Sequence, residues 1–139
     1  MNSLDAAIYS RLTGTAITSL LAGTTSMYPS AVYNMQALEG APYPYIVFNV
    51  QGGGDENDNP HRTQNLVLFV RAYSNISKKN AGSIDAQIDT ALHMVPFTGV
   101  TGYTGTWLAR EQLLEGVENP PTGAQIFMSG GIYRSRLAQ

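Results

Sequence analysis

Residues 51–61, with the sequence QGGGDENDNPH, contain the residue types that most often bind a phosphate or a metal ion. The backbone N–H groups of Gly52, Gly53 and Gly54 could cradle a phosphate, but such a loop also needs a lysine and a following helix. This segment has no lysine, an apolar strand-like stretch follows it, and its acidic residues would repel a phosphate. The sequence therefore argues against a phosphate site.

The same segment offers side-chain oxygen atoms that could bind calcium. The donors are Asp55, Glu56, Asn57, Asp58 and Asn59. Their spacing differs from that of an EF-hand, and no glutamate closes the segment. Glycine entropy and the lack of apolar side chains predict instead a mobile, solvated loop that becomes ordered on contact with a partner. Residues 52–58 are therefore a candidate assembly-interface loop.

The other residues that could do chemistry do not form a catalytic pattern. His61 and His93 have no neighbours that complete a triad or a metal site. Asp85 and Asp89 lie one helical turn apart, but paired carboxylates on a polar helix face are normally solvated. Arg71 either is buried and pairs with a carboxylate or carbonyl group, or lies at a strand edge or extends its charged end to the solvent, and the sequence favours the second interpretation. We expect no cofactor, no metal site and no enzymatic activity.

Composition limits the class of protein. A chain of 139 residues without cysteine forms one domain, residues 1–139, and has no disulfide scaffold. No apolar run reaches about 20 residues, so no membrane span is expected. No secretory signal is visible, which predicts synthesis in the cytoplasm.

Charge is scarce. Only 13% of residues are charged, compared with roughly 25% in ordinary soluble domains. Residues 1–54 contain only Asp5, Arg11 and Glu39 as charged residues. A net charge of −2 without a basic cluster argues against a dedicated nucleic-acid binder. A charge-poor surface suits extensive protein–protein contact.

The pattern of apolar residues predicts an α+β fold. The expected helices span residues 3–13, 15–22 and 78–95, the last capped by Asn75 or Ser77. The expected main strands span residues 45–51, 62–74, 106–114 and 125–137. We expect a brief strand at 27–29, a long loop over 30–42, a turn at 116–123 and a bulge or bend at Gly130-Gly131. The prediction is a mainly antiparallel sheet of about four strands with two or three helices packed on it.

The whole chain resembles the tail-terminator or tail-completion proteins of long-tailed bacteriophages, to which the lambda tail terminator is a distant fold relative. The resemblance rests on the helical segments SLDAAIYSRLTG and TAITSLLAG and on the strand YPYIVFNV. It also includes the strand-to-helix segment LVLFVRAYSNISKKNAGSIDAQIDTALH, the strand TWLAREQLLEG and the terminal IYRSRLAQ. The segments GGGDENDNP and GVENPPTG lie outside the resemblance.

This resemblance implies a virion structural protein at the junction of tail and neck. Its copies would form a ring, commonly a hexamer, that caps the head-proximal end of the tail tube. The expected partners are further copies of the chain, the tail tube protein and the head–tail connector or neck protein. DNA would pass through the lumen without sequence-specific binding. Two alternatives remain: a neck adaptor or head-completion protein on the connector side, and a small-molecule-binding α+β domain.

Overall fold

The computed structural model describes residues 2–58, 61–96, 100–121 and 123–138. Its elements follow in the order α1 (Asn2–Leu12), α2 (Thr15–Thr18), β1 (Val32–Asn34), β2 (Tyr45–Asp58), β3 (His61–Ser74), α3 (Lys78–Leu92), β4 (Gly105–Glu118) and β5 (Ile126–Ala138). In this part of the chain, no helix is both long and apolar enough to cross a membrane.

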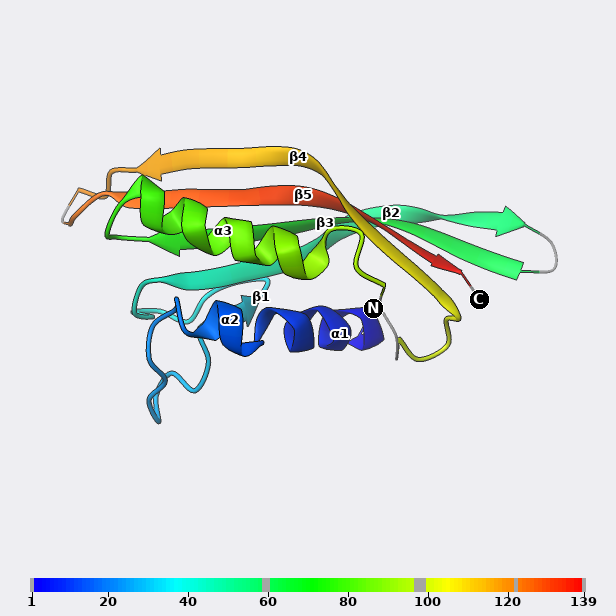
Figure 1. Ribbon diagram of the computed structural model, residues 1–139, viewed down its shortest axis with the longest axis horizontal. Helices are drawn as coiled ribbons and strands as arrows, with labels where there is room; N and C mark the ends of the chain where they lie inside the picture. Colours follow the sequence, from blue (N-terminus) through cyan, green and yellow to red (C-terminus); the bar gives the residue numbers. More distant parts are fainter. Residues whose placement is uncertain (1, 59–60, 97–99, 122, 139) are drawn as a thin grey trace.

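The strands form one sheet in the order β1-β2-β3-β5-β4. The short strand β1 runs parallel to β2, and all other neighbouring strands are antiparallel. Figure 1 shows α1 and α3 lying against the same side of this sheet. The predicted α+β class is confirmed, with five strands where about four were expected.

The core lies between the helices and one face of the sheet. Along β3, Leu68, Val70 and Ala72 alternate toward the helices and are fully buried. The apolar stripes of α1 and α3 meet them with side chains that are also fully buried: Leu4, Ile8, Leu12, Ile84, Ile88 and Leu92. The two apolar stripes that predicted these helices therefore form the core.

Helix lengths differ from the prediction where polar side chains compete with the backbone. The predicted helix 15–22 is only the single turn α2, where the Thr18 and Ser19 hydroxyls donate to carbonyl groups of the preceding turn. The helix predicted to reach residue 95 ends at Leu92, and Met94 has a positive φ of 55°. Ser77 caps α3, because its side chain accepts a hydrogen bond from the Asn80 N–H.

Strand β1 was not predicted. It lies within residues 30–42, which were expected to be a loop, whereas the strand expected at 27–29 is absent from the described structure. Three residues are too few to show an alternating pattern. The strand forms because its backbone pairs in parallel with Ile46, Val47 and Phe48 of β2.

The segment predicted to be a loop after residue 50 is largely strand. Strand β2 continues through the glycines to Asp58, and its partner β3 begins at His61, so only residues 59 and 60 of the predicted loop lie outside the described structure. A bulge between Val50 and Gly52 shifts the register, after which pairing with β3 resumes without interruption. Backbone pairing with an adjacent strand thus outweighs the low strand propensity of glycine.

Gly53 allows the two backbones to come close together. A Cβ atom at this position would lie 2.1 Å from the Asn65 carbonyl oxygen and 2.7 Å from the Leu66 Cα atom. Its φ of 155° is also unfavourable for any residue with a side chain. A Cβ at the adjacent Gly54, in contrast, would meet nothing within 4 Å.

These two glycines provide a matched test of the hairpin. We expect Gly53→Ala to lower the free energy of unfolding by about 1–3 kcal/mol, because backbone atoms must move apart. Gly54→Ala should change it by no more than about 0.5 kcal/mol. Urea unfolding of both variants provides the measurement. Equal values would show that β2 and β3 separate easily at Gly53.

Strand β4 is longer than predicted, whereas β5 has the predicted length and is shifted by one residue. A bulge or bend was predicted at Gly130-Gly131; no bulge lies there, because β5 pairs with β3 in continuous register through both residues. The bulge lies on β4, between Arg110 and Gln112. The glycines provide space instead: a Cβ at Gly130 would lie 2.2 Å from the Val70 carbonyl oxygen, and one at Gly131 would lie 2.6 Å from Arg110 Nε.

Candidate assembly interface

The predicted interface residues Gly52–Gly54 and Asp55–Asp58 all lie on the distal part of β2. The Asp55 carboxylate accepts a hydrogen bond from Gln64 at 3.1 Å and lies 3.8 Å from Arg62 Nε. The side chains of Asn57, Asp58 and His61 lie outside the described part of the structure. The structure thus brings the predicted residues together on one strand.

Glu56, the next residue on β2, also contacts side chains of neighbouring strands. Its carboxylate accepts hydrogen bonds from Asn65 at 3.3 Å and from Arg136 at 3.2 Å. No three His, Cys, Asp or Glu side chains among the described residues come close enough to hold a metal ion. These carboxylates therefore serve as partners for cations and amides of neighbouring strands.

One edge of the sheet is formed by the distal part of β2. Strand β1 pairs with residues 46–48 only, and the Met35 N–H extends this contact to the Phe48 carbonyl. Within the described chain, no strand pairs with this side of β2 from Asn49 to Asp58. The backbone N–H and C=O groups along this stretch are available to another strand.

The opposite edge of the sheet is β4. The segment after α3 occupies part of it, because the Met94 N–H donates to the Leu108 carbonyl at 2.7 Å. Similarly, the Arg110 N–H donates to His93 Nδ1 at 3.0 Å, so that ring nitrogen acts as an acceptor. From Gln112 to Glu118, β4 has no second neighbouring strand in the part of the chain that the structure describes.

Exposed apolar side chains accompany this free part of β4. Leu113 is 55% exposed and Val117 is 49% exposed. Their strand register places them on the helix-bearing face, beside Gly131 and Phe127 of β5. Glu115, between them, forms an ion pair with Lys78 at 3.0 Å. The edge therefore combines free backbone groups with an apolar side-chain surface.

A buried charge cluster joins α3 to the sheet, and the sequence did not reveal it. Arg110 Nη1 donates to Asp85 Oδ2 at 3.0 Å, and Nη2 donates to the other carboxylate oxygen. Arg110 Nη2 also donates to the Tyr133 hydroxyl at 2.8 Å. Asp89 Oδ1 lies 3.3 Å from Arg110 Nε without forming a hydrogen bond. The expectation of a solvated Asp85 is wrong, because this residue is buried.

The environment of this cluster fixes its protonation states. Burial by itself lowers the pKa of Arg110, but the hydrogen bond to Asp85 and the charges nearby outweigh it, so the net shift of the pKa is upward. Burial also raises the pKa of Tyr133, although the Arg110 guanidinium acts in the opposite direction. Arg110 stays cationic and Tyr133 stays neutral, and the cluster fastens α3 to β4 and β5.

Arg71 has the carbonyl partner that was one of the alternatives considered from the sequence, and the favoured position at a strand edge is wrong. It lies on the central strand β3, and its Nη2 donates to the side-chain amide oxygen of Asn49, Oδ1, at 3.4 Å. Its buried Nε makes no hydrogen bond to any described residue. Arg71 lines a shallow depression of about 290 Å³ together with Tyr45 and Tyr73. Since no helix covers this face in Figure 1, the depression opens to the surface.

Four tyrosines gather beside this depression. The Tyr45 ring stacks on Tyr43 with centroids 4.8 Å apart and also contacts Tyr33 and Tyr73, with centroids at 5.7 and 5.4 Å. Burial is the main cause that raises the pKa values of Tyr33, Tyr45 and Tyr73. These hydroxyl groups lose a proton less readily in the folded protein than in the unfolded chain.

This asymmetry predicts loss of stability at alkaline pH. The unfolded tyrosines deprotonate near pH 10, whereas the buried ones hold their protons to higher pH. Stability should therefore be constant with respect to these groups below about pH 10 and fall above it. Urea unfolding at increasing pH measures the slope. Tyr73→Phe should make the slope shallower, and an unchanged slope would exclude Tyr73 from the effect.

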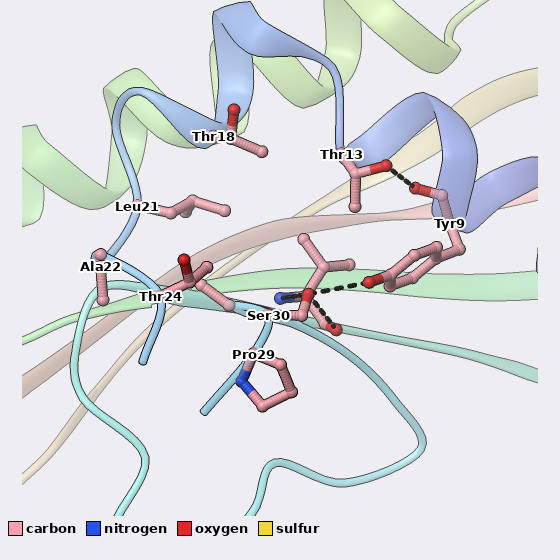
Figure 2. A pocket seen from close by; sticks show the side chains of 11 residues that line it. Tyr9, Thr13, Thr18, Leu21, Ala22, Thr24, Pro29 and Ser30 are labelled. Carbon is pink, nitrogen blue, oxygen red and sulfur yellow. Dashed lines mark hydrogen bonds between the residues drawn. The ribbon is translucent and has the colours of Figure 1, made fainter. Parts of the chain in front are cut away.

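Another depression lies between the two N-terminal helices and residues 21–32. It has a volume of about 450 Å³, and the residues that line it carry no charge. Figure 2 shows hydroxyl groups around it, among which the Tyr9 hydroxyl donates to Ser30 Oγ at 3.0 Å. Thr13 donates in turn to the Tyr9 carbonyl at 2.9 Å. This is a neutral polar surface, suited to contact with a protein segment.

Comparisons with known proteins agree with this architecture. No curated protein matches the sequence. Eighteen chains of solved structures match the fold. One of them belongs to the virion of a native gene transfer agent (GTA) particle and is 16% identical, with a TM-score of 0.71. The similarity covers 98% of this chain and 95% of that chain, which establishes a shared fold.

The sequence matches the family described as tail completion protein gp17 over residues 6–116. This match spans most of α1 through most of β4, and so includes Asp85, Arg110 and the distal part of β2, whereas β5 lies outside it. The chain therefore belongs to the tail completion protein gp17 family and is a phage tail structural protein.

Proposed function

We propose that the protein is a tail terminator. Its copies form a ring, taken to be a hexamer, that caps the head-proximal end of the tail tube and provides the surface for joining the head. The observation that carries this proposal is membership of the tail completion family across residues 6–116. The partners are further copies of the chain, the tail tube protein and the head–tail connector or neck protein.

The described surface supports a ring. A closed ring is built from head-to-tail contacts, so each subunit must present two different patches. The sheet ends in two different edges, the distal part of β2 and the C-terminal part of β4. Residues 52–58, identified from the sequence as an assembly segment, form one of these edges.

The distribution of charge supports passage of DNA without tight binding. A basic lumen would bind phosphates strongly and hold the DNA. Here Arg62, Arg134 and Arg136 each lie in an ion pair with a carboxylate of the same chain, with distances of 3.8, 2.7 and 3.2 Å. With a net charge of −2, we propose a neutral or mildly acidic lining.

Removal of the protein and complementation test this function. Particles assembled without it should have tails of uncontrolled length or tails that fail to join heads, and complementation with the wild-type chain should restore normal particles. Electron microscopy of the particles gives the result. Normal tails that attach to heads would contradict the proposal. Tail-less heads that leak DNA would instead identify a neck adaptor on the connector side.

A further inference from the structure

The two free edges of the sheet point to the way in which neighbouring copies contact each other. We propose that β4 of one copy pairs with the distal part of β2 of the next copy, so that the sheets join into one continuous barrel around the lumen. This inference rests on the ring proposed above. Residues 112–118 provide one edge and residues 49–58 provide the other.

Beyond its bulge between Arg110 and Gln112, the β4 edge lacks several of the features that normally prevent such pairing. Free strand edges are usually protected by lysine, proline, a covering loop or a very short strand. Residues 112–118 contain neither lysine nor proline, and the segment around His93 and Met94 covers β4 only as far as Arg110. Leu113 and Val117 remain exposed at the edge. Such an edge in an isolated subunit is a site for strand addition.

The β2 edge has a complementary shape. Gly52, Gly53 and Gly54 present no side chains, so bulky side chains of an adjacent strand can lie over this stretch. A β4–β4 pair would leave the β2 edge unpaired and would close as a dimer instead of a ring. When the β4 edge pairs instead with the β2 edge of a second copy, the backbone groups of both edges form hydrogen bonds.

Four of the acidic residues at or beside the two edges each lie next to a cation of the same chain. On β2, Asp55 lies beside Arg62, and Glu56 accepts a hydrogen bond from Arg136. On β4, Glu111 lies 2.7 Å from Arg134, and Glu115 lies 3.0 Å from Lys78. Each of these carboxylates is neutralised by a cation of its own chain before the edges meet.

The strand directions fit as well. Strands β2 and β4 run in opposite directions within one sheet, because three antiparallel pairings separate them. If the ring axis runs roughly along the strands, rotation about it leaves each strand pointing in the same direction in every copy. The β4 of one copy therefore meets the next β2 in the antiparallel arrangement.

A contact in which Leu114 lies opposite Gly52 would agree with the tilt of strands in barrels. Through the register, Leu114 lies level with Arg71 of β3, whereas Gly52 and Gly53 lie level with Val67 and Leu66. The difference of four to five residues corresponds to about 13–17 Å along the strand, across four strand spacings of about 19 Å in total. The resulting tilt is about 35–40°, and strands in barrels tilt by about 35–45°.

A charge placed at the β4 edge tests the contact. We expect Leu113→Lys and Val117→Lys to remain folded, because both side chains are half-exposed. Each should raise the concentration needed for ring assembly by about tenfold or more, since a lysine at a free edge opposes strand pairing. Ile76→Lys, at an exposed position outside both edges, is the matched control and should assemble normally. Thermal unfolding checks the fold, and mass measurement in solution reports assembly.

Engineered cysteines identify the partner strand, because the chain has no cysteine of its own. Gly54 and Gln112 lie on the helix-free face, and a pairing of Leu114 with Gly52 places them opposite each other. A Cβ at Gly54 meets nothing within 4 Å in the isolated chain. Oxidation of chains with Gly54→Cys combined with Gln112→Cys should give a ladder of linked chains up to the ring. Each single variant should give none. Dimers from a single β4 variant would overturn the proposal in favour of β4–β4 pairing.

The two proposals fail separately. Wild-type rings that yield no β2–β4 cross-links, together with normal assembly of Leu113→Lys, would overturn the edge pairing and leave the tail-terminator function in place. Normal attached tails in particles without the protein would overturn the function, and the edge pairing with it.

Discussion

Replacement of Asp85 by alanine is expected to destabilise the protein by about 3–5 kcal/mol. The side chain of Asp85 is 7% exposed, and it is the carboxylate that accepts hydrogen bonds from both Nη atoms of Arg110. Its removal leaves a guanidinium group in a largely buried site, with Tyr133 as its remaining hydrogen-bond partner. Urea unfolding measures the loss, and α3 should separate from β4 first.

Asp89→Ala is the matched control. Asp89 lies one turn further along α3 beside the same guanidinium, but its side chain is 41% exposed, so its loss should cost about 0–1 kcal/mol. The double variant with leucine at Asp85 and Arg110 should recover part of the loss, because no buried guanidinium is left without its carboxylate and the remaining Asp89 is 41% exposed. A small, equal effect of Asp85→Ala and Asp89→Ala would show that water reaches the cluster.

Replacement of Ile88 by alanine is expected to cost about 2–5 kcal/mol. Ile88 is fully buried in the core formed by α1, α3 and the sheet. Deleting three carbon atoms leaves a cavity against Leu68 and Val70 of the central strand, which is fixed on both sides by its neighbours. The sheet can collapse little into this space.

Gln87→Ala serves as the control for Ile88. This residue precedes Ile88 on α3 and is exposed, and alanine supports a helix at least as well as glutamine. Its effect should stay within about 0.5 kcal/mol. If Ile88→Ala also changed the free energy of unfolding by so little, neighbouring side chains would have to repack into the space between α3 and the sheet.

The sequence predicted those elements whose apolar residues recur with a clear period. Leu4, Ile8 and Leu12 repeat every four residues and are all buried, which explains the accuracy for α1. Alternation along residues 66–72 placed β3 inside the sheet in the same way. Local pattern suffices where the hydrophobic face alone decides the structure.

The sequence failed where a partner strand or a distant side chain decides the structure. Composition made residues 52–58 look like a loop, and only pairing with β3 makes them a strand. The position of Asp85 offered a signal that was missed, since it falls within the apolar stripe between Ala81 and Ile88. Its partner Arg110 is 25 residues away, and no local pattern connects them.

The same limit applies to the candidate interface. Residues 52–58 were identified because their composition is unusual, and they form one free edge of the sheet. The other edge was not identified, because Leu113 and Val117 look like ordinary core residues of a strand. Their exposure follows from the position of β4 beyond β5, at the end of the sheet.

Both long edge strands carry a single bulge, between Val50 and Gly52 on β2 and between Arg110 and Gln112 on β4. A bulge bends its strand and increases the local twist. In a closed barrel, the curvature contributed by each subunit determines how many copies complete the circle, and hence the diameter of the bore. Deleting Gln51 or Glu111 would flatten the wall and favour a wider circle with more copies. The number of copies in the ring would then depend on the two bulge residues, Gln51 and Glu111, more than on the strength of the contacts between copies.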